Sequence, residues 1–258
     1  MNFCRTLIGI CHDSCVECLR FCSAWLALSR TTTVLMLALQ SYALGEIRPS
    51  ADDILSAVAE NEQRKASLLK RYTGLRRYTL RNSRFHVDAS MTVRLEYRQN
   101  TGKTFTILEK KGSERVLQRV FEPILTAETE ASRGSTRNQA LLSPANYRAQ
   151  MIGQEWQRGR ECWVLAIEPK HRSKYVIRGK IWVDRRESEP VQLQGRPAAS
   201  VSFWVGEPSV FEQFAKQNGF WMPARMTSKS WGLLLDYSEL TIDYYGYEFS
   251  MATNSSIH

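Results

Sequence analysis

The chain has 258 residues, of which 43% are hydrophobic and 24% are charged, and this globular composition excludes wholesale disorder. A formal net charge of +9 favours acidic partners, but the lysines and arginines are scattered and no nucleic-acid-binding motif accompanies them. We therefore interpret the charge as a solvated surface and expect no nucleic-acid partner.

The N-terminal segment predicts an export signal. Its apolar core, Val34 to Leu39, follows the positively charged Arg30, and small residues suited to cleavage come next. The core is shorter than the roughly 20 apolar residues that span a bilayer, although an uncleaved signal anchor is the alternative. We expect residues 1–45 to be a leader and residues 46–258 to be one exported domain, because no flexible linker divides them.

Most of the cysteines lie in this predicted leader. Five of the six occur there: Cys4, Cys11, Cys15, Cys18 and Cys22. Their spacing matches neither zinc-ribbon nor ferredoxin patterns, so we expect no metal site. The predicted domain keeps Cys162, in "ECWVLAI", where a lone cysteine is usually a small buried apolar residue.

Residues 49–72 predict an amphipathic helix. Ser50 and Asp53 have the spacing of a capping box, which satisfies the first free amides of a helix. The apolar residues that then recur at helical spacing are Ile54, Leu55, Val58, Ala59, Ala66, Leu69 and Tyr72. Such a stripe can lie across a sheet.

After Gly74 the apolar period changes to two. In "MTVRLEYR" the residues Met91, Val93, Leu95 and Tyr97 alternate with polar ones, which is typical of a half-buried antiparallel strand. We predict a meander of three strands over residues 75–82, 85–98 and 104–110.

A helical or irregular insertion follows, over "FEPILTAETEASRGSTRNQALLSPANY". Pro123 is placed near a helix start and Gly134 near its end. The helix is short and weakly amphipathic. It fits either a lid over an open sheet face or an ordinary connector.

The second half returns to strands. Residues 158–160 predict a turn between two of them, and "KYVIRGKIWVDRRESEPVQLQG" predicts a hairpin in which Ile181 and Val183 share one face and Trp182 points to the other. Three more strand-like segments follow. Two helices and about ten strands in long hairpins predict an α+β fold built on one curved antiparallel sheet.

No catalytic motif stands out. The sequence has no nucleophile elbow, zinc-protease motif, phosphate loop or dinucleotide fingerprint. His86 and Asp88 could share a strand face, but a metal would need a third ligand. We interpret Asp184, Glu187 and Glu189, at a hairpin tip rich in arginine, as solvated ion pairs. We predict no enzyme, no cofactor and no metal site, with a secreted hydrolase as the least favoured alternative.

Large apolar side chains occupy many strand-like segments: Trp163, Trp182, Phe203, Trp204, Phe220, Trp221 and Trp231. They fit an ordinary core. They also fit a concave apolar cavity for a lipid or acyl chain, because a strongly curved sheet has more inner face than two helices can cover. The pattern alone leaves both interpretations open.

The order of these segments resembles that of the LolA-like family of periplasmic lipoprotein carriers, whose superfamily includes LolB and RseB-type sensors. The similarity is clearest to outer-membrane lipoprotein-sorting proteins. It covers roughly residues 50–247, in "KKGSERVLQRVFEPIL", "SPANYRAQMIGQEWQRGRECWVLAIEPKHRSKYVIRGKIWVD" and "GFWMPARM". The resemblance implies a half-open β-barrel with a helical lid and an apolar interior that holds acyl chains. Family members couple the lid to a basic residue in the sheet, which no motif places here.

From this resemblance we expect a monomeric, non-catalytic periplasmic carrier of lipoprotein or lipid acyl chains, tethered to the membrane if the leader is not cleaved. Its protein partners would be membrane-protein donors or acceptors of the envelope. Because side chains alternate between the two faces of a strand, we predict that ten inward-facing residues form the ligand-binding wall: Met91, Val93, Leu95, Phe105, Ile107, Leu165, Ile167, Ile177, Ile181 and Val183. The alternative is a sensor or scaffold of the same fold that binds a protein through an exposed edge strand.

Overall fold

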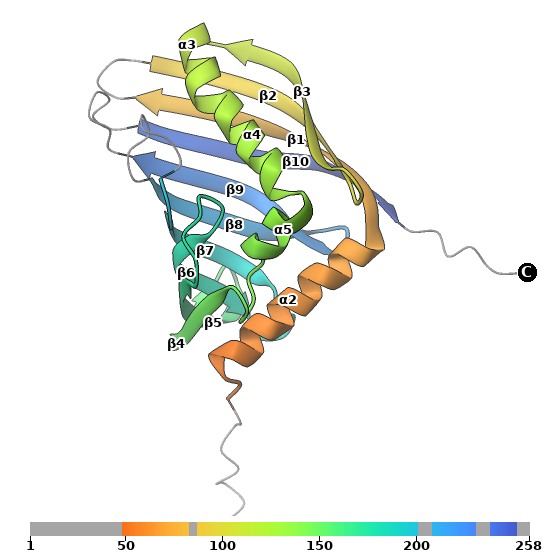
Figure 1. Cartoon of the computed structure of the whole chain (residues 1–258), viewed down its shortest axis with the longest axis vertical. Coiled ribbons are helices and arrows are strands. Elements are labelled where there is room, and N and C mark those ends of the chain that lie inside the picture. Colours follow the sequence, from red (N-terminus) through yellow and green to blue (C-terminus); the bar gives the residue numbers. More distant parts are fainter. Residues whose placement is uncertain (1–47, 83–86, 201–207, 231–237, 252–258) are drawn as a thin grey trace, which may run out of the picture. The chain divides into compact units, whose positions relative to one another are not determined.

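The computed structural model describes residues 48–82, 87–200, 208–230 and 238–251 (Figure 1). The predicted leader lies outside these residues, as do His86, Phe203, Trp204 and Trp231. The division of the chain into a leader and one domain therefore stays a prediction.

Ten antiparallel strands form one sheet in the order β3-β2-β1-β10-β9-β8-β7-β6-β5-β4. The strands are β1 (Leu69–Asn82), β2 (Val87–Arg98), β3 (Gly102–Lys111), β4 (Tyr147–Gln157), β5 (Arg160–Pro169), β6 (Ile177–Asp184), β7 (Pro190–Pro197), β8 (Ser209–Gln217), β9 (Phe220–Ser230) and β10 (Ser238–Met251). The sheet is strongly curved, and its edges β3 and β4 do not pair with each other in the described part of the chain (Figure 1). The predicted α+β class and half-open barrel are confirmed.

The first described helix is α2 (Ala51–Leu68), and it begins as predicted. The Ser50 N–H donates to Asp53 Oδ2 at 3.0 Å, and the Asp53 N–H donates to Ser50 Oγ at 3.1 Å. The helix ends earlier than predicted, because Leu69 and Tyr72 belong to β1 and pair with β10. None of the helices in the described ranges is long and apolar enough to cross a membrane.

The insertion between β3 and β4 is more helical than expected. It contains α3 (Glu114–Val116), the π-helical turn η2 (Leu117–Phe121), α4 (Glu122–Ala131) and α5 (Gly134–Ala140). Pro123 lies in the first turn of α4, as predicted. Gly134 does not end that helix. It begins α5, with a φ of +48° that favours glycine.

Two helical segments cover the same concave face of the sheet in separate places (Figure 1). Under α2, the side chains of Leu55 and Val58 pack on Leu165, Ile181 and others from β4 to β7. Under the insertion, a second core forms from Leu117, Phe121 and Leu125 with Tyr78, Met91, Val93 and Ile242. The concave face therefore has two apolar cores, one under each helical segment.

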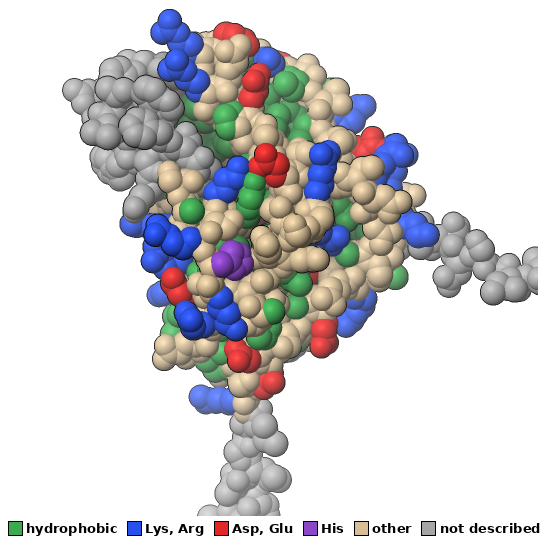
Figure 2. Space-filling view, viewed as in Figure 1, with side chains coloured by type: hydrophobic (Ala, Val, Ile, Leu, Met, Phe, Trp, Pro, Cys, Tyr) green, Lys and Arg blue, Asp and Glu red, His purple; other side chains and the backbone are tan. Residues whose placement is uncertain are grey.

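The opposite face of β5 and β6 carries a third cluster. Trp182 packs with Cys162 and Val164 there, while its neighbours Ile181 and Val183 belong to the core under α2. The predicted placement of Trp182 on the opposite face from Ile181 and Val183 is confirmed, and Cys162 is buried as expected. On the face seen in Figure 2, Lys and Arg side chains are spread among acidic and apolar ones.

The β6–β7 hairpin contains a pair of facing glycines. Gly179 of β6 lies opposite Gly195 of β7. A Cβ atom on Gly179 would lie 2.1 Å from the carbonyl oxygen of Gln194, so the two backbones come together more closely than any side chain would allow. This close approach requires glycine.

Gly179→Ala should lower the free energy of unfolding by about 1–3 kcal/mol, because the backbone must move to admit the methyl group. The matched control is Gly153→Ala in β4, where an added Cβ meets nothing within 4 Å. That variant should change the free energy by less than about 1 kcal/mol. Urea unfolding followed by tryptophan fluorescence checks both, and equal stabilities would contradict the close approach.

Candidate functional site

A pocket of about 360 Å³ lies where α2, the α4–α5 segment and the concave face of the sheet meet. Val58, Glu62, Lys65 and Ala66 border it from α2 at a spacing that puts them on one side of the helix. The other walls come from α4, α5, strands β1–β3 and β8–β10, and the start of β7. The pocket thus collects residues from most of the chain.

The pocket walls are mainly apolar and aromatic. Tyr72 stacks on Tyr97 with ring centroids 4.8 Å apart, and the Tyr247 hydroxyl donates to the Pro223 carbonyl at 3.0 Å. Phe214 and Trp221 add ring surface from β8 and β9. Walls that are mainly apolar and aromatic are typical of sites for small ligands.

Arg76 of β1 is a buried charge beside this pocket. Because side chains alternate along a strand, it points to the same face as Tyr78, and only 2% of it is exposed. The guanidinium forms an ion pair with Glu128 of α4. It also lies over the rings of Phe105 and Tyr244, with its Cζ 5.2 and 4.8 Å from the centroids.

Glu128 is the centre of the polar cluster around Arg76. It also accepts from the Tyr78 hydroxyl at 3.2 Å and pairs with the Lys103 ammonium of β3 at 3.4 Å. Burial acts to raise the pKa of Glu128, but the charges of Arg76 and Lys103 outweigh it and hold that pKa at about 2. Burial raises the pKa of nearby Glu212, on β8, to about 7.

No sequence pattern predicts that Arg76 and Glu128 form a site. Arg76 is a basic residue of the sheet that is paired with a helix of the insertion, and no motif marks it. Its inward position could have been read from the alternation in "RYTGLRRYTLRN", where it shares a face with Tyr78 and Leu80. No comparable signal marks Glu128.

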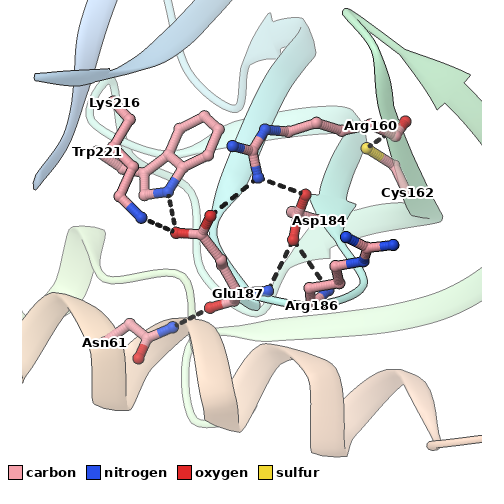
Figure 3. Close-up of polar contacts among 8 residues, drawn as sticks. All are labelled: Asn61, Arg160, Cys162, Asp184, Arg186, Glu187, Lys216 and Trp221. Atoms are coloured by element: carbon pink, nitrogen blue, oxygen red, sulfur yellow. Dashed lines mark hydrogen bonds and ion pairs between the residues drawn. The ribbon is translucent and has the colours of Figure 1, made fainter. Parts of the chain in front are cut away.

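A second polar cluster holds the β6–β7 turn (Figure 3). Asp184 is only 3% exposed and accepts from the N–H groups of Arg186 and Glu187, at 2.9 and 2.7 Å, and from Arg160 Nη1 at 2.9 Å. The prediction that it is a solvated ion pair is therefore wrong. Turn amides and Arg160 replace water around this carboxylate.

Glu187 connects this turn to other elements. Its carboxylate accepts from Lys216 Nζ at 2.6 Å, from Trp221 Nε1 at 2.9 Å and from Arg160 Nη1 at 2.9 Å. These hydrogen bonds, that from Lys216 first, lower its pKa to about 2. Asn61 of α2 donates to the Glu187 carbonyl at 2.8 Å. The cluster thus fixes α2, the turn and β9 around one side of the pocket.

Burial raises the pKa of two further groups, Glu189 and Cys162. Glu189 borders the pocket, and burial raises its pKa to about 7. Burial likewise raises the pKa of the Cys162 thiol to about 11, so it is protonated near neutral pH. Among the described residues, no three His, Cys, Asp or Glu side chains are grouped as a metal site would require.

The ten predicted wall residues lie mostly in the cores. Met91 and Val93 are buried under the insertion, and Phe105 packs against them. The members buried under α2 are Leu165, Ile167, Ile181 and Val183, with Ile177 packed against them. Leu95 is buried, whereas Ile107 is 38% exposed. None of the ten borders the 360 Å³ pocket, and their contact with a ligand stays a prediction.

No family model and no curated protein matches this sequence. Solved structures with a similar fold include a LolA superfamily protein from Nitrosomonas europaea, which is 13% identical, with 79% of this chain and 94% of that chain covered at a TM-score of 0.44. A DUF1329 family protein from Desulfovibrio piger is 10% identical, with 81% and 96% covered at a TM-score of 0.45. A domain assigned to outer membrane lipoprotein sorting, from Vibrio parahaemolyticus, is 10% identical, with 79% and 94% covered at 0.43. The chain is thus similar to LolA-like proteins, as expected, and this likeness concerns the fold alone.

Glu128→Gln should lower the free energy of unfolding at neutral pH by about 3 kcal/mol, because it leaves the buried Arg76 without its counter-charge. The native pKa of about 2 lies below the ordinary value of 4.5. The stabilisation is therefore complete above about pH 4.5 and is lost as the pH falls through the native pKa.

Urea unfolding at neutral pH and at about pH 3 measures this difference, which should shrink in acid. The matched control is Glu122→Gln on the same helix, whose side chain is 48% exposed and 4.0 Å from Lys110. It should change stability by less than about 0.5 kcal/mol. If both variants were equally stable, the ion pair would not hold α4 to the sheet.

Proposed function

We propose that this chain is an exported, non-catalytic carrier that binds an acyl chain of a lipid or lipoprotein in the pocket between α2, α4–α5 and the sheet. The observation that supports this function is the apolar pocket of about 360 Å³ on the concave face of an unclosed sheet. Ligand pockets measure roughly 300–1,000 Å³, so this one lies at the small end of the range. A pocket of this volume favours the binding of one acyl chain over several.

Transport by this carrier needs a pocket that opens, and α4 is the element that would move. It is held to the sheet by Glu128 and to the β5–β6 connection by Glu130, which pairs with Lys174 at 3.0 Å and accepts from the Tyr175 hydroxyl. These polar attachments are few, and Leu125 of α4 adds apolar contacts with the core under the insertion. Opening would break both kinds of contact and would leave the strand ladders intact.

Ala66→Trp should weaken the binding of a neutral apolar fluorophore such as N-phenyl-1-naphthylamine by about tenfold or more, because the indole would fill the pocket. Ala66 borders the pocket from the last turns of α2 and is half-buried, so the helix can accept the larger side chain. The matched control is Gln63→Trp, on the exposed side of α2.

A fluorescence titration measures the binding, and circular dichroism confirms that both variants are folded. The control should bind as the natural protein does. Equal binding by the two folded variants would contradict the location of the site. A purified natural protein that bound no fluorophore and carried no extractable lipid would contradict the carrier function.

A second function is favoured by the edge of β4, which pairs only with β5 in the described part of the chain. This strand ends the sheet order, and Ile152 and Trp156 are 45% and 74% exposed. An extended segment of an envelope protein could add to such an edge. In that case a protein partner should co-purify in stoichiometric amount, and Trp156→Lys should reduce its recovery without changing fluorophore binding. Unchanged recovery would contradict this edge as the binding surface.

A further inference from the structure

The charges around the pocket are not evenly distributed. Where the insertion meets β1 and β3, the cations Arg76, Lys103 and Arg137 border it, and Glu128 is the acidic residue among them. Arg137 borders a second, polar hollow together with Gly102 and Ser132, and the Lys103 N–H donates to Ser132 Oγ at 2.8 Å. We call these three cations the basic end of the pocket.

Glu62 and Glu189 border the pocket elsewhere, from α2 and the start of β7. Lys65, the cation beside them, pairs with Glu62 at 2.5 Å and also donates to the Trp221 carbonyl at 3.1 Å. This part of the wall therefore carries no excess of positive charge. The pocket is thus polarised between its basic end and α2.

The basic end lacks acceptors for its donors. Glu128 is the carboxylate that pairs with Arg76 and Lys103, and nearby Glu212, whose pKa burial raises to about 7, adds at most a second negative charge against the three cations. Arg76 Nε is buried with no hydrogen-bond partner among the described residues. Buried donors without acceptors and cations without counter-charge cost free energy. Lys103 is accessible to a ligand, since its side chain is 26% exposed, whereas that of Arg76 is only 3% exposed. An incoming anion would meet Lys103 first, with Arg76 behind it.

We propose that the ligand of this pocket is an anionic amphiphile, with one apolar chain against the aromatic walls and a carboxylate or phosphate head at the basic end. Lys103 and Arg137 bind the head directly, and Arg76 adds its charge from behind. This inference rests on the proposed function and specifies the class of ligand. A fatty-acid carboxylate and a monoacyl phosphate share this chemistry.

The test is a competition against the neutral fluorophore with three ligands that share one alkyl chain: dodecanoate, dodecyl phosphate and dodecan-1-ol. At neutral pH and low salt, below the micellar concentration, at least one anionic ligand should displace the fluorophore at about tenfold lower concentration than the alcohol does. The anion that displaces the fluorophore at the lower concentration then shows whether the site prefers a carboxylate or a phosphate head.

Lys103→Gln should remove most of this preference and leave displacement by dodecan-1-ol unchanged. The matched control is Lys180→Gln, at an exposed position of β6, which should keep the preference. If Lys103→Gln does not fold, Arg137→Gln on α5 is a second variant of the same end. Circular dichroism checks the fold of each.

The outcomes separate the two proposals. Equal displacement by all three ligands would overturn the anionic ligand and leave the apolar carrier intact. A preference that survives in folded Lys103→Gln and Arg137→Gln would overturn the assignment of the basic end. Failure of the fluorophore itself to bind the natural protein would overturn the proposed function and this inference together.

Discussion

The ion pair between Arg76 and Glu128 is the interaction on which the closed arrangement depends. A guanidinium that is 2% exposed must keep a counter-charge, and the carboxylate that supplies it lies on a separate helix of the insertion. Moving α4 away from the sheet therefore means either hydrating Arg76 or giving it another anion. In the proposed carrier, this one charge would couple the position of α4 to the presence of an anion in the pocket.

The curvature of the sheet explains why a pocket exists beside solid cores. Two separate helical segments cover parts of the concave face, and each packs on its own group of strands. The pocket is the place where neither segment fills the space. The ten wall residues predicted from parity do face inward in most cases. Most of them lie beneath one of the two helical segments, where helix side chains fill the space, and not in the gap between the two segments that forms the pocket.

Local patterns in the sequence predicted the local structure well. The capping box at Ser50, the strand meander and the opposite faces of Ile181 and Trp182 all follow from spacing over a few residues. The site could not be predicted in this way, because Arg76 and Glu128 are 52 positions apart and meet only once the insertion folds back over β1. The burial of Asp184 could not be predicted for a similar reason, since its partner Arg160 comes from the preceding hairpin.

Two buried carboxyl groups, one at the pocket and one near it, oppose the stability of the fold as the pH rises. The pKa values of Glu189 and Glu212 are about 7, above the ordinary value of 4.5, chiefly because of burial. Between these values the native state binds more protons than the unfolded state, so both groups lower the stability as the pH rises through this window. Glu189 borders the pocket, and Glu212 interacts with the charges of Glu128, Lys103 and Arg76. Ionisable groups with strongly shifted pKa values are concentrated at functional sites. The raised pKa of Glu189 therefore supports the proposed location of the binding site at the pocket rather than in the cores.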